Sequence, residues 1–152
     1  KLAWTWLLTH PGASLIYYGD EIGLPGYHDP DNRQMMYWEW NDWESSVQEH
    51  VSILANARKM YPQLSKADPV VWWGEPDENV LAYALSYENQ HALVVLNRSN
   101  QPTQITNALT WANLPSVGTV TNLISNENIT LQTDQLSLAL QPFESQVWIW
   151  QN

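Results

Sequence analysis

The sequence predicts two structural parts, a strand-and-helix unit of an α/β barrel followed by an antiparallel β-sandwich. Over residues 1–65, helical patterns lie on both sides of one short apolar run, as expected for a parallel strand and its helices. From about Lys66, short β-branched and aromatic runs alternate with turn residues, which is typical of a sandwich. We therefore expect a barrel-type part over residues 1–65 and an all-β part over residues 66–152.

The first segment predicts the end of a helix and then a strand. Apolar residues recur at helical spacing in residues 1–9, and Pro11 and Gly12 stop the pattern. Residues 13–18 have the apolar character of a parallel strand that is covered on both faces. The loop that follows, residues 19–44, is long and rich in aromatic residues, and structured loops of this length are usually functional.

A second helix is predicted after this loop. It should begin near Ser45 or Ser46, because Gln48 and Glu49 follow three residues later as in a capping box. Pro62 should end it. Its expected apolar surface consists of Val47, Val51, Ile53, Leu54, Ala57, Met60 and Leu64, with Arg58 on the same stripe.

The remaining sequence predicts eight strands. We place them at 70–74, 79–87, 91–98, 103–107, 119–124, 129–132, 135–141 and 145–151. Asn89 and Gln90 should form the turn between the second and third strands. Apolar and polar side chains alternate in Leu136-Ser137-Leu138, and Val147 and Ile149 should lie opposite Trp148 and Trp150.

The composition indicates a folded protein and excludes several functions. Apolar residues make up 44% of the 152 residues, with 10 Trp and 7 Tyr, which is enough for a sizeable core. The net charge of −10 with only 6 Lys and Arg disfavours binding to nucleic acid and to anionic membranes. The absence of cysteine excludes disulfides and thiolate chemistry, and no histidine or carboxylate spacing encodes a metal site, so we expect no cofactor in this chain.

The loop after the predicted strand carries the residues that we expect to bind a ligand. Gly19, Gly23 and Gly26 allow backbone angles that other residues avoid. Asp29 offers acceptors and Arg33 a rigid fork of donors, a combination suited to hydroxyl groups. Because α/β barrels bind substrate at the C-terminal ends of their strands, this loop predicts a sugar-contacting edge of a barrel enzyme.

Two blocks of this segment carry a family resemblance. Residues 12–23 read Gly-Ala-Ser-Leu-Ile-Tyr-Tyr-Gly-Asp-Glu-Ile-Gly, and residues 29–33 read Asp-Pro-Asp-Asn-Arg. In order and spacing they resemble the α-amylase superfamily, glycoside hydrolase family thirteen, at its eighth barrel strand. Ser14 stands where that family usually has proline, and His10 where leucine or methionine is common. Neither departure touches the expected chemistry.

The resemblance implies an architecture and a function. It implies the last strand and helix of a (β/α)8 TIM barrel, preceded by the end of the seventh helix and followed by an antiparallel Greek-key β-sandwich, domain C. It also implies a parent enzyme that cleaves α-1,4-glucans such as starch and maltooligosaccharides with retention, or a related transglycosidase. By the same resemblance, Asp29 and Arg33 bind a glucose unit on the non-reducing side of the scissile bond.

The resemblance further implies that the catalytic residues lie elsewhere. The family's nucleophile, acid/base and stabilising carboxylates belong to earlier strands, and a whole barrel takes about 250 residues. We therefore expect a C-terminal fragment whose catalytic groups precede Lys1 and which is inactive alone, because retention requires two positioned carboxyls. Its expected partners are an α-glucan oligosaccharide and the remainder of the catalytic barrel. A calcium ion is compatible only with the parent's other part, and a secreted or periplasmic location is favoured over the cytoplasm.

The loop residues also have structural interpretations. Asp29 and Arg33 could form an ion pair that stabilises the loop, and the two roles can coexist. Tyr27 and His28 flank the pair and could stack on or hydrogen-bond to a sugar, or simply be solvated. Asp20 and Glu21 are adjacent, so their side chains should point to opposite faces, and we expect one of them to anchor the loop or to pair with an arginine on another barrel strand.

The tryptophans leave two interpretations open. If strand alternation holds, one of Trp72 and Trp73 enters the core and the other is exposed as a candidate sugar platform. Core or interface packing is the expectation for both. We expect Trp38, Trp40 and Trp43 to pack where the second helix meets the base of the barrel, rather than to bind sugar. The alternative to an enzyme part is a non-catalytic module whose sandwich binds glucan or supports the barrel.

Overall fold

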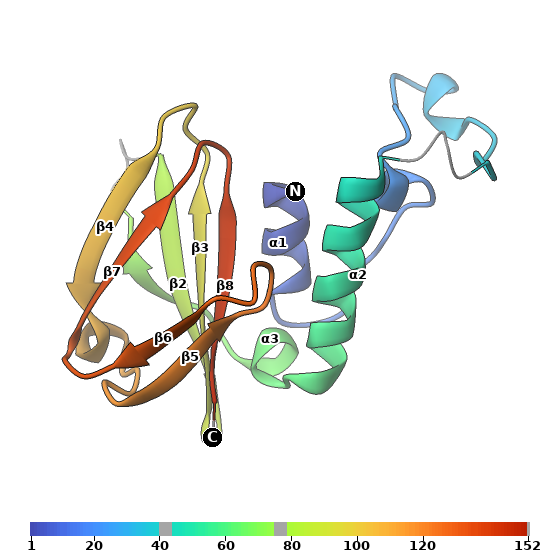
Figure 1. The fold of residues 1–152 in the computed structure, drawn as a ribbon. Helices are drawn as coiled ribbons and strands as arrows, with labels where there is room; N and C mark the ends of the chain where they lie inside the picture. Colours follow the sequence, from blue (N-terminus) through green and yellow to red (C-terminus); the bar gives the residue numbers. More distant parts are fainter. Residues whose placement is uncertain (40–43, 75–78, 152) are drawn as a thin grey trace.

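A computed structural model describes residues 1–39, 44–74 and 79–151, in which a layer of helices covers one side of a β-sandwich (Figure 1). The helices are α1 (Leu2–Leu8), α2 (Ser45–Met60) and α3 (Gln63–Lys66), with short 3-10 helices η1 (Asp20–Ile22), η2 (Asp31–Arg33) and η4 (Leu109–Ala112). The strands are β1 (Val70–Trp73), β2 (Val80–Tyr87), β3 (Gln90–Asn97), β4 (Thr103–Ala108), β5 (Gly118–Asn122), β6 (Asn128–Leu131), β7 (Gln135–Leu140) and β8 (Ser145–Trp150).

The eight strands form the antiparallel sandwich that the sequence predicts, and each has ends within two residues of the expected ones. One sheet has the order β1-β2-β3-β8-β5-β6, and β4 pairs with β7 in a second sheet. The core between the sheets includes Trp72, Trp148 and the leucines of β7, whose burial alternates as predicted. The β2–β3 turn consists of Glu88 and Asn89, one residue earlier than expected, because Tyr87 pairs with Gln90.

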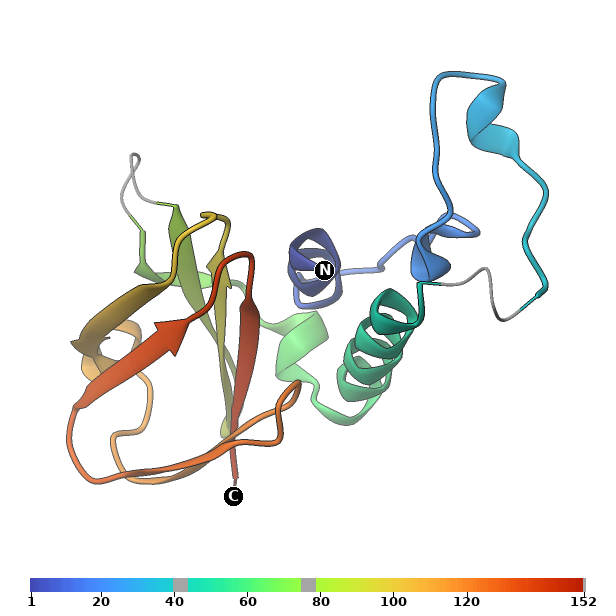
Figure 2. The same ribbon diagram turned by 45° about the horizontal axis from the view of Figure 1, so that its top comes forward.

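The middle strands of the six-stranded sheet are covered on both faces, by the helices on one side and by the β4–β7 sheet on the other (Figure 2). All six residues of β8 are buried, although their side chains point alternately to opposite sides. Trp148 and Trp150 belong to the sandwich core, whereas Val147 and Ile149 belong to the cluster under the helices. The predicted alternation along this strand is therefore an alternation between two cores.

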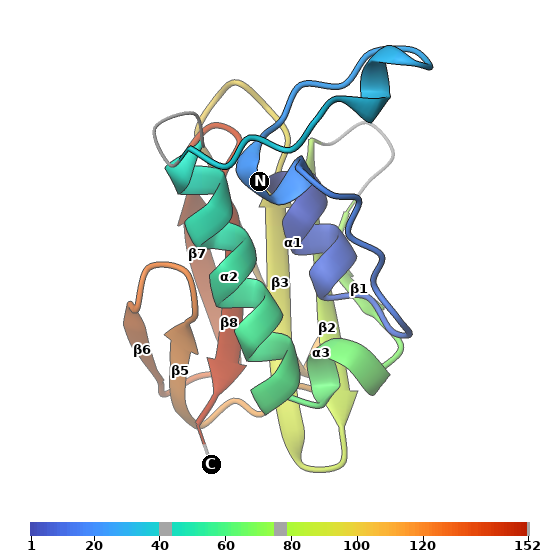
Figure 3. The ribbon, with the colours of Figure 1, turned by 90° about the vertical axis from the view of Figure 1, so that its right-hand side faces the viewer.

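The helical layer consists mainly of α1 and α2, which lie side by side on the sheet (Figure 3). The bounds of α2 match the prediction, but the capping box does not form. Glu44 is the N-cap, and the hydroxyl of Ser46 donates to Glu44 Oε1 at 2.7 Å. Both serines are already inside the first turn, so neither hydroxyl lies at the capping position. Met60, expected on the apolar surface, is exposed.

The strand predicted over residues 13–18 is absent, and this expectation was wrong for the structure. The segment is extended coil, and Leu15 is 83% exposed. A strand needs a neighbour to accept and donate its backbone hydrogen bonds, and no described segment pairs with this one. Trp38, expected to seal the base of α2, is exposed as well, while Trp40 and Trp43 lie outside the described residues.

The two tryptophans of β1 both pack against the sandwich core. Trp72 is fully buried and its Nε1 donates to the carbonyl of Ala108 at 2.9 Å, and Trp73 is partly buried against the same cluster. The cause is a β-bulge between Val71 and Trp73, which sets two residues opposite one of β2. The idea that one of these rings alternates outward was wrong, and packing accounts for both.

Candidate functional site

The candidate site is the loop of residues 17–34, which extends from the helical layer (Figure 1). Gly19 and Gly23 have φ of 92° and 75° and bracket η1. A Cβ on Gly19 would lie 2.5 Å from Leu24 Cδ2, so a side chain there would force Leu24 to move, and the positive φ disfavours it as well. Glu21 Oε2 accepts the backbone N–H of Gly19 at 2.8 Å. Glu21 thus anchors the loop, while Asp20 is exposed.

Asp29 and Arg33 meet at the outer end of this loop. The turn of η2 brings Arg33 Nε to 2.9 Å from Asp29 Oδ1, and the side chains stay 68% (Arg33) and 63% (Asp29) exposed. An exposed pair of this kind contributes only about 0–1 kcal/mol to stability. A guanidinium has five N–H donors, and within the described part of the chain this ion pair engages only one of them and one carboxylate oxygen. The pair can therefore stabilise the loop and still offer donors and acceptors to a ligand.

Two tyrosines form a wall at the inner end of the loop. The rings of Tyr17 and Tyr18 lie 4.8 Å apart, and the Tyr18 hydroxyl donates to the carbonyl of Gln34 at 2.9 Å. With Asp20 and Asn32 they line a pocket of 240 Å³. This wall was not predicted, because the pattern of residues 13–18 is that of a buried strand, which includes both tyrosines. The signal was the aromatic pair directly before Gly-Asp-Glu.

Tyr27 and His28 are solvent-exposed beside the ion pair. The Tyr27 side chain is 73% exposed, and the carbonyl of His28 accepts the N–H of Asp31 at 2.7 Å. Neither residue lines the tyrosine pocket. The structure therefore brings Asp29 and Arg33 together but builds no enclosed site around the other two candidates.

The described residues form neither a cluster of metal-binding side chains nor a helix that could cross a membrane. Across residues 1–39, 44–74 and 79–151, no group of three or more histidine and carboxylate side chains could hold a metal ion. In the same residues, no helix has the length and apolar character needed to cross a membrane.

A second polar cluster is buried between the helices and the sheet. Thr5 Oγ1 lies 2.8 Å from His50 Nε2 and 2.8 Å from Ser145 Oγ, and Thr9 Oγ1 lies 2.5 Å from the Tyr83 hydroxyl. Burial, and next the positive charges of the N-terminal amine and Lys1, lower the pKa of His50 to about 4. These groups are closed to a substrate, so the cluster joins α1 to α2 and β8.

Arg58 completes this attachment. Its Nη1 donates to the carbonyls of Leu8, His10 and Leu64 at 2.6–2.9 Å, and its Nη2 donates to the carbonyl of Gly12. The guanidinium therefore satisfies the C-terminal end of α1, where helix carbonyls have no partners of their own. The helical pattern predicts that Arg58 lies on the same stripe as the apolar residues but does not predict its carbonyl partners.

Comparison with known proteins identifies the all-β part. Residues 73–147 match the family model described as Maltogenic Amylase, C-terminal domain. Cyclomaltodextrinase of Geobacillus thermopakistaniensis is 31% identical over 147 residues, covering 94% of this chain and 24% of the relative. Neopullulanase 2 of Thermoactinomyces vulgaris is 30% identical over 152 residues, covering 99% and 25%. The chain thus spans about a quarter of the length of these curated relatives.

Solved structures share the fold. Ttha1563 from Thermus thermophilus superimposes with a TM-score of 0.84 at 32% identity, over 99% of this chain and 30% of that one. A cyclomaltodextrinase structure gives a TM-score of 0.88 at 21% identity, over 99% of this chain and 25% of its own, which bears on the fold alone. Both superpositions include the helices as well as the sandwich. The chain belongs to the α-amylase superfamily, and its sandwich is a C-terminal domain of that family.

Proposed function

We propose that this chain is the C-terminal part of a retaining amylase-type glycosidase or related transglycosidase that acts on α-1,4-glucans. The support is that relatives named cyclomaltodextrinase, neopullulanase and maltogenic α-amylase align with 89–99% of the chain. These relatives are about four times longer than their aligned region, so the proposal places the catalytic carboxylates in the rest of the parent protein.

The observation that carries the binding role is the exposed pair of Asp29 and Arg33 on a braced loop. The Gly19–Glu21 hydrogen bond fixes the start of the loop, and the Tyr18–Gln34 hydrogen bond ties Tyr18 to the residue after Arg33, which limits the entropy lost when a ligand binds. The Asp29 carboxylate can accept from sugar hydroxyls, and the free donors of Arg33 can bind sugar oxygens. We assign this pair to a glucose unit on the non-reducing side of the scissile bond.

The chain alone should not hydrolyse glucans. Retention needs two carboxyl groups about 5–5.5 Å apart on either side of the scissile bond. Asp20 and Glu21 are the adjacent carboxylates of the loop, and Glu21 is already engaged by the Gly19 amide. Turnover of maltooligosaccharides by the purified 152-residue chain would refute this assignment.

Kinetics of the full-length enzyme test the binding role. We expect Asp29→Ala and Arg33→Ala each to raise KM for maltooligosaccharides roughly tenfold or more, since hydrogen bonds to charged groups contribute about 1.5–3 kcal/mol. The double variant should cost less than the sum, because the residues contact each other. Glu127→Ala, an exposed carboxylate on the sandwich, is the control. A KM unchanged in Asp29→Ala, in Arg33→Ala and in the double variant would contradict the assignment.

A second candidate function is glucan binding by the sandwich itself. Trp111 of η4 is largely exposed, and flat aromatic rings cover the apolar faces of sugars. Titration of the chain with maltoheptaose, followed by NMR and compared with Trp111→Ala, tests it. Identical spectra with and without sugar would exclude this role.

A further inference from the structure

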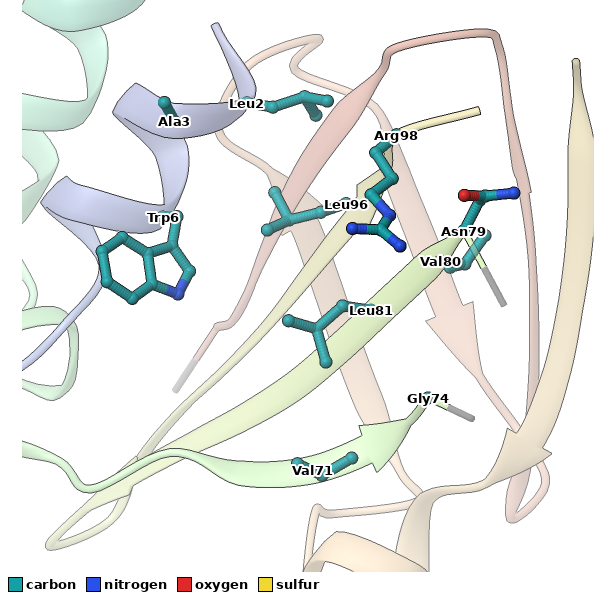
Figure 4. A pocket seen from close by; sticks show the side chains of 10 residues that line it. All are labelled: Leu2, Ala3, Trp6, Val71, Gly74, Asn79, Val80, Leu81, Leu96 and Arg98. Carbon is teal, nitrogen blue, oxygen red and sulfur yellow. The ribbon is translucent and has the colours of Figure 1, made fainter. Parts of the chain in front are cut away.

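A polar pocket lies at the end of the sandwich where β2 and β4 begin and β3 ends (Figure 1). Its volume is 340 Å³, and pockets that bind small molecules measure about 300–1,000 Å³. Asn79 and Val80 line both this pocket and the hollow beside α1, where Figure 4 shows them on the side away from that helix. We call the first of these the sandwich-end pocket, which is lined by these two residues together with Trp73, Asn97, Ser99, Gln101, Thr103 and Ile105.

One side of the sandwich-end pocket is apolar. Val80 and Ile105 belong to the core between the two sheets. Trp73 packs against that core and is only partly buried, so its ring is shared between the core and the pocket. Flat aromatic rings cover the apolar faces of sugars. This side of the pocket therefore suits the C–H face of a sugar ring.

The polar side of the pocket is held in place by the side chain of Asn97, which is fully buried. Its Nδ2 donates to the carbonyls of Gln101 and Gln141 at 2.9 Å, and its Oδ1 accepts the N–H of Ser99 at 2.9 Å. The N–H of Gln101 in turn donates to Ser99 Oγ at 3.0 Å. These hydrogen bonds fix the turn between β3 and β4 before a ligand arrives, which lowers the entropy cost of binding.

Two hydroxyl groups offer hydrogen bonds at this side of the pocket. Thr103 pairs with Leu140, a core residue, so its side chain points to the inner side of the small sheet. A hydroxyl donates and accepts at the same time, so Ser99 can still donate although its oxygen accepts the Gln101 amide. The pocket therefore presents both donors and acceptors.

The lining of the sandwich-end pocket excludes a charged ligand. Within the described part of the chain no charged side chain lines it, although the sequence has 16 acidic and 6 basic residues. A phosphate or carboxylate would find no guanidinium or ammonium partner there, and a hard cation would find no carboxylate. Neutral donors and acceptors beside an aromatic ring indicate a neutral, hydroxyl-rich ligand.

The pocket lies at the same end of the molecule as the loop of Asp29 and Arg33. In Figures 1 and 3, this loop leaves the upper end of the helical layer, where α2 begins. The start of β2 and the end of β3 lie at the upper end of the sandwich in the same views. A long ligand that contacts the loop therefore has the pocket at its own end of the molecule.

We propose that the sandwich-end pocket binds a short stretch of an α-1,4-glucan chain, in addition to the glucose unit assigned to Asp29 and Arg33. The choice of a neutral, hydroxyl-rich ligand comes from the pocket itself, whereas the choice of an α-glucan rests on the proposed function. Trp111, the exposed aromatic residue of η4, does not line this pocket. The two positions on the sandwich are therefore separable by experiment.

NMR titration of the 152-residue chain with maltoheptaose tests the pocket directly. We expect the largest shifts of amide signals in residues 97–104. The Kd should rise about threefold to tenfold in Thr103→Val, because one neutral hydrogen bond is lost. Thr106→Val is the matched control, since Thr106 is exposed and pairs with Ser137 on the outer side of the same strand.

Three outcomes of this titration would overturn the proposal. The first is a set of shifts confined to other residues, such as those around Trp111. The second is an equal Kd in the unchanged chain, in Thr103→Val and in Thr106→Val. The third is equal binding of cellohexaose, a β-linked chain, because the pocket would then not select α-glucans.

Kinetics of the parent enzyme provide an independent test. In the double variant Gln101→Ala, Thr103→Val, the ratio of KM for amylose to KM for maltotriose should rise at least about fivefold, because only the long substrate reaches a second position. An unchanged ratio would refute the proposal. The two sugar roles fail separately: unchanged KM in Asp29→Ala and Arg33→Ala would refute the loop assignment, while the NMR shifts at the pocket would stay in place.

Discussion

The hydroxyl of Thr5 on α1 lies 2.8 Å from Nε2 of His50 on α2, and the same hydroxyl reaches Ser145 at the start of β8. One threonine therefore joins two helices and one of the two middle strands of the large sheet. The contact is buried, so its strength depends on the protonation state of the histidine.

The His50 contact predicts that stability falls in mild acid. The pKa of His50 is about 4 in the fold against 6.5 for an ordinary histidine, so the unfolded chain binds the extra proton between these values. The contribution of neutral His50 to the free energy of unfolding should be fully present above pH 7. It should decrease as the pH falls from 6.5 toward 4, by up to about 3 kcal/mol. Urea unfolding at pH 7.5 and 4.5 measures this decrease in the free energy of unfolding. In the variant His50→Gln most of the decrease should disappear. An equal decrease in both proteins would show that another group is responsible.

Arg58 is predicted to hold the end of α1 to α2 and α3. Arg58→Met leaves the carbonyls of Leu8, His10, Gly12 and Leu64 without this donor, and we expect a loss of about 2–3 kcal/mol in the free energy of unfolding. Arg58→Lys should recover only part, because an ammonium cannot reproduce the guanidinium fork. Thermal unfolding, with the exposed neighbour Lys59→Met as control, gives the comparison. If the two methionine variants melt alike, the carbonyl contacts do not contribute.

The bulge in β1 predicts unequal costs for its two tryptophans. Trp72→Ala removes a fully buried ring and its hydrogen bond to Ala108, so we expect a loss of about 3–5 kcal/mol. Trp73 is only partly buried, and Trp73→Ala should cost clearly less. Chemical denaturation of both variants measures the difference. Equal costs would indicate that the bulge does not place the rings as described.

The sandwich could be predicted from the sequence because its strands carry their own patterns. The alternation of Leu136, Ser137 and Leu138 fixes which face of β7 is buried. The bulge beside Trp72 could not be predicted, because it depends on the register against β2 rather than on the residues of β1. The strand expected over residues 13–18 failed for a related reason: its pattern describes a strand that has neighbours.

The candidate site, too, could be predicted from the sequence only in part. The four-residue spacing of Asp29 and Arg33 was compatible with the contact that the structure contains. The buried cluster joins Thr5 and His50, whose proximity exists only after folding, since those two residues are 45 positions apart. Local chemistry is visible in a sequence, whereas such long-range contacts need the fold.

The position of β8 has a consequence for how this domain forms. It follows every other strand in the chain, yet it lies between β3 and β5, and the β5–β6 hairpin joins the large sheet only through it. During synthesis, β3 and β5 have no strand to pair with between them until β8 has left the ribosome. A stop codon before Ser145 would therefore not trim the edge of the domain but divide its large sheet in two.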